Sequence, residues 1–154
     1  MADAYSDALR LLAGRELSAA ELRARLLARE HPPPDVEVAV QRLIADGSLD
    51  DGRVARAYAR TAVDVKGRGR LRIARELHDK GIARDVIAAA LADVLGDRDE
   101  RTLVARAIDK KLRGARPSGA SAFGRLYQHL MRQGFSPAVV SAELRRLRGG
   151  RDDE

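Results

Sequence analysis

The sequence predicts an all-α protein, built as an elongated, curved array of three tandem three-helix repeats. Apolar residues recur at helical spacing along the chain, and no stretch alternates as a strand would. Only 3% of the 154 residues are aromatic, so the core must consist of Leu, Val, Ile and Ala, which suits closely packed helices. Apolar positions also recur with a fixed longer period, as a repeat array requires.

The first repeat, residues 1–50, is expected to be acidic and to hold three helices, the first over residues 3–13. A capping box opens the second, because the Ser18 hydroxyl and the Glu21 carboxylate each accept a hydrogen bond from a backbone amide. The triple-proline run ends this helix, and Asp35 is expected to cap the third. The residues expected to face the core are Tyr5, Ala8, Leu9, Leu12, Leu22, Leu26, Leu27, Val36, Val40, Leu43 and Ile44.

The second repeat, residues 51–97, is expected to be basic and also to hold three helices. Asp50 and Asp51 precede its first helix, whose positive end favours carboxylates. The second helix is expected over residues 68–79, and Asp85 is expected to cap the third. The residues expected to face the core are Val54, Ala55, Tyr58, Ala62, Leu71, Ile73, Ala74 and Leu77.

The third repeat, residues 98–148, is basic and is expected to begin with a helix over about residues 99–113. A linker with Pro and Gly separates this helix from the second. Ser136 and Pro137 suit the cap and the first position of the last helix. Residues 149–154 are predicted to be a disordered tail.

Four apolar positions recur three times, with internal spacings of 4, 10 and 4 residues and offsets of 51 and 53 residues between sets. Gly81 and Gly134 occupy the same slot in the second and third sets, where each is expected to end a helix in the left-handed conformation. Chance in a chain rich in Leu and Ala is the alternative, and tandem repeats are the preferred interpretation. The sets are Leu22, Leu26, Val36 and Val40; Ile73, Leu77, Ile87 and Leu91; and Leu126, Leu130, Val140 and Leu144.

The net charge of +6 is spread unevenly, with −3 over residues 1–50, +3 over residues 51–99 and +6 over residues 100–154. This gradient indicates a polyanion or an acidic partner at the middle and C-terminal parts. Ordinary solvation of an Arg-rich chain is the alternative.

The sequence does not resemble an enzyme, and it predicts no catalytic residue, metal site or cofactor. The chain has no cysteine, which excludes disulfides and thiolate chemistry, and its three histidines lack metal-ligand spacing. Asp50 and Asp51 could hold a magnesium ion, but adjacent side chains point apart, so the capping role is preferred. The glycine-rich stretch 66–70 lacks the ending of a phosphate-binding loop.

A cytoplasmic protein is expected, because the N-terminus lacks a signal-peptide pattern and the absence of cysteine fits a reducing compartment. The longest apolar stretch without arginine, residues 86–92, is far shorter than the ~20 residues of a membrane span. The small number of aromatic residues favours a monomer.

Clustered basic residues are the candidate binding surface. Arg68, Arg72 and Arg75 have the spacing of one helix face, opposite the apolar positions. Several such groups together favour contact with phosphates, but with few aromatic side chains any binding of DNA should be weak, non-specific and sensitive to salt. For each residue, plain solvent exposure is the alternative. The residues predicted to contact a partner or DNA are Lys66, Arg68, Arg70, Arg72, Arg75, Arg125, Arg132, Arg145 and Arg146.

Several segments resemble the RecX family of proteins that modulate RecA recombinase. Residues 43–55, LIADGSLDDGRVA, resemble the family's "L…G.LDD.RFA", with Val54 where phenylalanine is usual. Residues 69–82 resemble "G..RI..EL..KGI". Residues 130–135 resemble "L..RGF" before the last helix, with Gln133 in the position before the glycine. The opening segments that match are 4–9 and 18–22.

The resemblance spans residues 4–148 and implies a fold of tandem three-helix repeats. It also implies a negative regulator of RecA that lies in the groove of the RecA–DNA filament, inhibits ATP hydrolysis and strand exchange, and promotes filament loss. The expected partners are therefore the RecA filament and, weakly, single- or double-stranded DNA. Two alternatives stay open: a non-specific DNA-binding helical module that acts independently of RecA, and an adaptor that docks an acidic protein without binding DNA.

Overall fold

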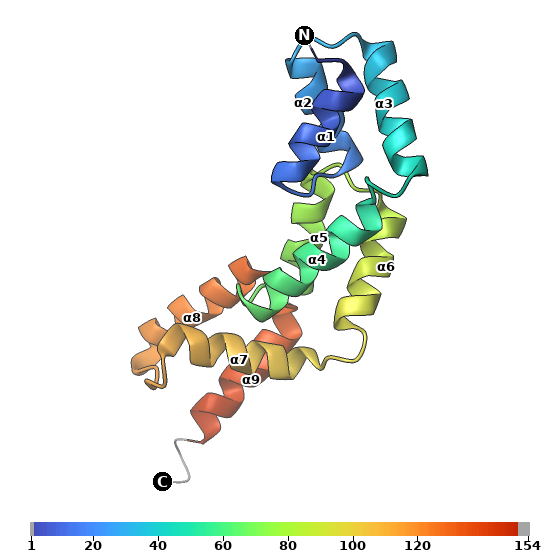
Figure 1. The fold of residues 1–154 in the computed structure, drawn as a ribbon. Helices are drawn as coiled ribbons and strands as arrows, with labels where there is room; N and C mark the ends of the chain where they lie inside the picture. The colour runs from blue at the N-terminus through green and yellow to red at the C-terminus, as the bar shows by residue number, and fades with distance from the viewer. Residues whose placement is uncertain (1, 151–154) are drawn as a thin grey trace. The chain divides into compact units, whose positions relative to one another are not determined.

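The computed structural model describes residues 2–150 of the chain. These residues form nine helices and no strand, which confirms the predicted all-α class (Figure 1). Most of the predicted tail, residues 149–154, lies outside the described residues, and Gly149 is the last residue of the final helix. The helices are α1 (Ala4–Gly14), α2 (Ala19–Ala28), α3 (Pro33–Ala45), α4 (Asp51–Asp64), α5 (Arg70–Asp79), α6 (Arg84–Leu95), α7 (Glu100–Leu112), α8 (Gly119–Gln133) and α9 (Pro137–Gly149).

The chain divides into two compact units. The first unit runs up to Tyr58 and resumes over Glu76–Ala90, and the second unit holds Ala59–Arg75 and continues from Leu91. The helices of the predicted middle repeat, α4, α5 and α6, are therefore shared between the units. The repeat boundaries after residues 50 and 97 stay predictions.

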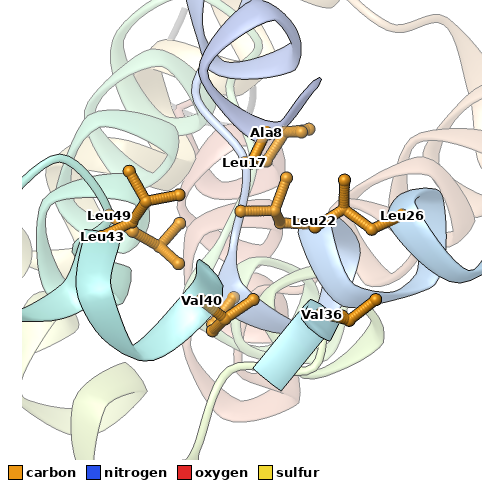
Figure 2. Packing of buried hydrophobic residues seen from close by; sticks show 9 residues of the cluster. Ala8, Leu17, Leu22, Leu26, Val36, Val40, Leu43 and Leu49 are labelled. Atoms are coloured by element: carbon orange, nitrogen blue, oxygen red, sulfur yellow. The ribbon is translucent and has the colours of Figure 1, made fainter. Parts of the chain in front are cut away.

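The core of the first unit lies between α1, α2 and α3. Leucines of α2 and valines of α3 point toward one another, with Ala8 of α1 and Leu17 beside them (Figure 2). Most of the predicted core positions of these helices are buried, but Leu9, Leu27 and Ile44 are exposed, so these three predictions were wrong. Each lies next to a buried position, at the edge of the apolar stripe. The buried cluster consists of Ala8, Leu17, Ala19, Leu22, Leu26, Val36, Val40, Leu43 and Leu49.

Local signals set the ends of α2 and α3. The predicted capping box is present, because Ser18 Oγ accepts from the Glu21 amide at 3.1 Å and Glu21 Oε1 accepts from the Ser18 amide at 3.0 Å. Asp35 lies in the first turn of α3 and does not cap it; the cap position is Pro32, without a side-chain hydrogen bond. Prolines are tolerated there because first-turn amides have no partner within the helix.

Asp50 and Asp51 cap two different helices. Asp50 Oδ1 accepts from the Arg53 amide of α4 at 3.1 Å, as a cap does. Asp51 Oδ1 accepts instead from the Ala19 amide at 2.8 Å, at the beginning of α2. Within residues 2–150, no group of three His, Asp or Glu side chains could hold a metal ion, and no helix is long and apolar enough to cross a membrane.

A buried carboxylate links α1 to the end of α2. The Asp7 side chain is only 8% exposed; its Oδ1 lies 2.6 Å from Arg29 Nη1 and its Oδ2 lies 2.8 Å from His31 Nε2. The hydrogen bond with His31 and the charge of Arg29 hold the pKa of Asp7 below its ordinary value, against the opposing effect of burial. This carboxylate therefore stabilises the fold above its ordinary pKa, and the contribution is lost as the pH falls through the acid range.

The substitution Asp7→Asn is expected to lower the free energy of unfolding by about 1–3 kcal/mol near neutral pH, because it removes the negative charge that interacts with Arg29 and His31. It should also weaken the loss of stability on acidification, since an amide does not titrate. Chemical denaturation at neutral and acid pH measures both effects. The exposed Asp93→Asn serves as the control, and equal effects of the two substitutions would contradict the prediction.

The second unit has its own core between α7, α8 and α9. Leu126, Leu130, Val140 and Leu144, the third set of repeated apolar positions, are all buried here, as predicted. Phe135 lies between α8 and α9 and is 1% exposed. The complete cluster is Val104, Ala107, Ile108, Phe123, Leu126, Leu130, Phe135, Val140 and Leu144.

Candidate partner-binding surfaces of the second unit

The loop between α4 and α5 is fastened to the turn between α8 and α9. The Gly69 amide donates to the Gln133 carbonyl at 2.7 Å, and the Leu71 amide donates to the Gly134 carbonyl at 3.1 Å. A Cβ added to Gly69 would lie 2.6 Å from the Gly134 carbonyl carbon, so the two backbones meet directly. This close approach fixes where the basic residues next to Gly69 lie in the second unit.

The left-handed glycines predicted from the repeat are present. Gly81 has a φ of 76° and Gly134 a φ of 95°. Gly134 follows the last residue of α8, and its amide hydrogen-bonds within the final helical turn. The close contact with Gly69 therefore depends on a backbone conformation that residues with a Cβ rarely adopt.

The predicted basic residues of this segment differ in exposure. Lys66, Arg70 and Arg75 are exposed, whereas Arg68 and Arg72 are half-buried. Arg72 Nη1 donates to Gln133 Oε1 at 3.2 Å, which adds to the fastening of the loop. The helix expected over residues 68–79 begins at Arg70, so Arg68 lies in the loop and does not share a helix face with Arg72 and Arg75.

Two aliphatic side chains of the same segment are also exposed to solvent. Val65 is 63% exposed and Leu71 is 59% exposed. Leu71 was predicted to face the core, and this prediction was wrong. We call the exposed residues of this segment the 65–75 surface, defined by Val65, Lys66, Arg70, Leu71 and Arg75. Exposed aliphatic side chains and arginines are both found in protein-contact surfaces.

A second basic feature is an open hollow of about 820 Å³ at α7 and α8. Arg125, His129 and Arg132 line it from α8, and Lys111 lines it from the end of α7. We call this feature the α7–α8 hollow. Its residues are Lys111, Leu112, Ser121, Ala122, Gly124, Arg125, Leu126, Gln128, His129 and Arg132, none of which is acidic.

The pKa of His129 reflects the charges around the α7–α8 hollow. Burial lowers its pKa from the ordinary value, and the charges of Lys111, Arg132 and Arg72 lower it further. The charges of Arg72 and Arg132, two of the predicted site residues, thus lower the pKa of the same imidazole. Sequence reasoning omitted Lys111 and His129 from the site. The sequence contains a signal for His129, since Arg125, His129 and Arg132 are spaced by 4 and 3 residues in a helix without acidic residues.

Arg145 and Arg146 lie at other places in the second unit. Arg146 Nη1 is 3.2 Å from Oε1 of the buried Glu143, which also accepts from Arg101 Nε at 2.6 Å. Arg145 lines a hollow with Tyr127 of α8 and Arg148 of α9. Neither arginine lines the α7–α8 hollow. The structure therefore does not unite all the predicted residues in one site.

Comparison with known proteins identifies the family. Residues 4–43 match the family model "RecX, first three-helix domain", and residues 50–91 match "RecX, second three-helix domain". The chain is 38% identical over 136 residues to the regulatory protein RecX of Halorhodospira halophila, covering 88% of this chain and 82% of that protein. The chain belongs to the RecX family.

Other RecX proteins agree with this membership. The regulatory protein RecX of Mycobacterium sp. (strain KMS) is 34% identical over 149 residues, covering 92% of this chain and 81% of that protein. The crystal structure of RecX from Lactobacillus salivarius has a TM-score of 0.77 and covers 94% of each chain at 22% identity. A second crystal structure of regulatory protein RecX has a TM-score of 0.78 at 24% identity and covers 90% of this chain and 70% of that one.

These comparisons confirm the resemblance stated from the motifs and the predicted tandem three-helix fold. The two matched RecX domains cover α1, α2 and most of α3, and α4, α5 and most of α6. The RecX relatives are named regulatory proteins and not enzymes.

Proposed function

We propose that this chain is a negative regulator of RecA recombinase that binds along the groove of the RecA–DNA filament. It inhibits ATP hydrolysis and strand exchange there and promotes loss of the filament. Membership of a family whose proteins are named regulatory protein RecX supports the proposal. The observation that carries it is the 65–75 surface, where cations and exposed aliphatic side chains occur together.

The mixture of side chains on the 65–75 surface favours a protein partner. The cations of Lys66, Arg70 and Arg75 complement an acidic surface and speed the encounter with it. Covering Val65 and Leu71 lowers the free energy of the complex only if apolar groups of the partner cover them. A DNA strand offers phosphates but few aliphatic contacts, whereas an acidic protein surface offers both kinds of partner.

A filament also multiplies weak contacts. Each RecA protomer in a filament presents the same surface, so a chain that touches more than one protomer binds with a high effective concentration at the second contact. Modest contacts through the 65–75 surface then suffice for binding that resists dissociation. A bound chain that bridges protomers would hinder the changes between protomers that accompany ATP hydrolysis.

The triple substitution Lys66→Glu, Arg70→Glu and Arg75→Glu is expected to raise the concentration needed for half-inhibition at least about tenfold, because it replaces attraction to an acidic partner by repulsion. The measurement is ATP hydrolysis by RecA filaments preformed on single-stranded DNA. These three residues are exposed, so helicity measured by circular dichroism should be retained. Arg68 and Arg72 are left intact because they are half-buried.

A matched control reverses three exposed arginines elsewhere, Arg25, Arg60 and Arg84. This variant has the same net charge as the test variant and should inhibit nearly as well as the original protein. Full inhibition by a folded test variant would exclude the 65–75 surface as the RecA contact. Unchanged hydrolysis under saturating original protein would contradict the proposed function itself.

The α7–α8 hollow favours a second candidate function, a non-specific DNA-binding module that acts independently of RecA. Its cations and the absence of acidic residues in its lining suit phosphates. DNA affinity that falls steeply with salt, together with no effect on RecA at any concentration, would select this alternative.

A further inference from the structure

We propose that the α7–α8 hollow binds backbone phosphates of a single nucleic-acid strand through Lys111, Arg125, His129 and Arg132. The inference rests on the second candidate function and specifies its ligand and its binding residues, which differ from those of the 65–75 surface. It is tested with nucleic acid alone, so its outcome is independent of the inhibition of RecA.

The geometry of α8 matches a chain of anions better than a single anion. Arg125, His129 and Arg132 follow one another at spacings of 4 and 3 residues, so they form one stripe along the helix. Arg125 and Arg132 are seven residue steps apart, or roughly 10 Å of helix length at ~1.5 Å per step. Lys111 adds a cation from α7 beside this stripe. Successive phosphates of one strand can each meet a cation in this arrangement.

The lining between the cations is apolar. Leu112 and Ala122 belong to this lining, whereas Leu126 is 3% exposed and belongs to the buried core. The chain has no aromatic residue among the lining side chains on which a base could stack. The only amide side chain of the hollow is Gln128, so at most one adenine of a strand can be read through a side-chain amide. We therefore expect binding that is independent of base sequence.

An acidic peptide fits the hollow less well. Both neighbouring elements are helices, so their backbone groups are already hydrogen-bonded and provide no edge to which an extended peptide could pair. A helical peptide would need a continuous apolar groove, whereas the α8 stripe is polar at each of its three positions, and two of these are arginines. Phosphates repeat at every nucleotide and need neither feature.

Binding of phosphate is linked to a proton on His129. The charged groups that face this imidazole are Lys111 of α7, Arg132 of α8 and Arg72 of α5, and all three disfavour its protonated form. A phosphate in the hollow offsets these charges, so protonation of His129 becomes easier when the strand is bound. By linkage, affinity for the strand must then rise as the pH falls through the range in which His129 titrates.

The first test uses the full chain, a fluorescent oligothymidylate and no RecA. The double substitution Lys111→Glu and Arg132→Glu is expected to weaken binding roughly tenfold or more at low salt and to make the salt dependence of affinity shallower by about one to two phosphate contacts. Both residues are exposed, so folding measured by circular dichroism should be unchanged.

The matched control reverses Arg25 and Arg84, two exposed arginines outside the hollow, with the same change in net charge. It should weaken binding far less than the hollow variant. Equal weakening by both variants, or affinity of the hollow variant equal to that of the original protein, would overturn the proposal. Competition by polyglutamate as effective as competition by unlabelled oligothymidylate would identify an acidic-peptide site instead.

The second test isolates the histidine. The original protein should bind oligothymidylate several-fold more tightly at about pH 5 than at about pH 8, because the pKa of His129 in the free protein lies below the ordinary histidine value. The substitution His129→Gln keeps a hydrogen-bond donor and should remove most of this pH dependence. An unchanged pH profile in His129→Gln would exclude His129 from the site. Because RecA is absent from both tests, the proposed DNA site can be disproved while inhibition of RecA holds. Likewise, the proposed inhibition of RecA can be disproved while the DNA site holds.

Discussion

Alanine in place of Gly134 is expected to lower the free energy of unfolding of the second unit by about 3 kcal/mol or more. The left-handed conformation of this residue, with a φ of 95°, costs any residue with a Cβ about 1–2 kcal/mol. The added Cβ would also lie 2.5 Å from Arg72 Cβ and 2.9 Å from Arg72 Cα, closer than packed atoms allow. The beginning of α5 must therefore move away from the α8–α9 turn.

Gly124→Ala is the matched control for Gly134→Ala. Gly124 lies within α8, its Cβ would meet no atom within 4 Å, and alanine favours the helix there by about 1 kcal/mol. Chemical denaturation followed by far-ultraviolet circular dichroism should thus move in opposite directions for the two variants. Similar effects of both substitutions would contradict the argued contact between Gly134 and α5.

The consequence of Gly134→Ala extends to the 65–75 surface. Displacement of the loop loosens the hydrogen bonds that the Gly69 and Leu71 amides make to the α8–α9 turn. Amide hydrogen exchange at Gly69 and Leu71 should therefore accelerate under conditions in which the chain is still folded. Retained protection at both amides would show that the loop is held by other contacts.

Truncation of Phe135 to alanine is expected to cost about 4 kcal/mol of folding free energy. Phe135 is 1% exposed and belongs to the buried cluster of α7, α8 and α9. Its removal leaves a cavity in addition to the lost burial of the ring, and such substitutions cost roughly 3–5 kcal/mol. A Cβ on Gly69 would lie 2.7 Å from Phe135 Cδ1, so the ring also supports the loop that carries the 65–75 surface.

Denaturation with urea measures the effect of Phe135→Ala, and Val38→Ala provides the control. Val38 is an exposed aliphatic residue of α3, and its truncation should change stability by no more than about 0.5 kcal/mol. A loss below about 1 kcal/mol for Phe135→Ala would mean that the core closes over the missing ring. Inhibition of RecA should weaken together with stability if the loop is displaced.

Much of the helical structure was predictable because its signals are local. The capping box of Ser18 and Glu21 and the left-handed Gly81 and Gly134 involve only a few consecutive residues, and the structure has all of them. The errors arose where a local pattern has two interpretations. Leu71 fits the apolar periodicity of its helix, yet its side chain is exposed to solvent. It is the second residue of α5, at the end of the helix that contacts the α8–α9 turn.

The candidate surfaces were only partly predictable. Lys66, Arg70 and Arg75 are exposed in the second unit, but exposure alone does not indicate a partner. The sequence placed Arg145 and Arg146 in the same set, and the structure locates them away from the α7–α8 hollow. Which residues of α7 and α8 lie near them depends on how α9 packs, and the spacing within α9 does not encode this.

The sequence by itself determined the helices, their principal ends, the buried apolar stripes and the membership of the RecX family, because each of these follows from residues close together in the chain. Only the tertiary structure decided that Asp51 caps α2 and that Lys111, Arg132 and Arg72 act together on His129. Such groupings join residues that are distant along the chain. They depend on how helices pack, and packing is set by the fit of whole surfaces, which the spacing of residues along one helix does not encode.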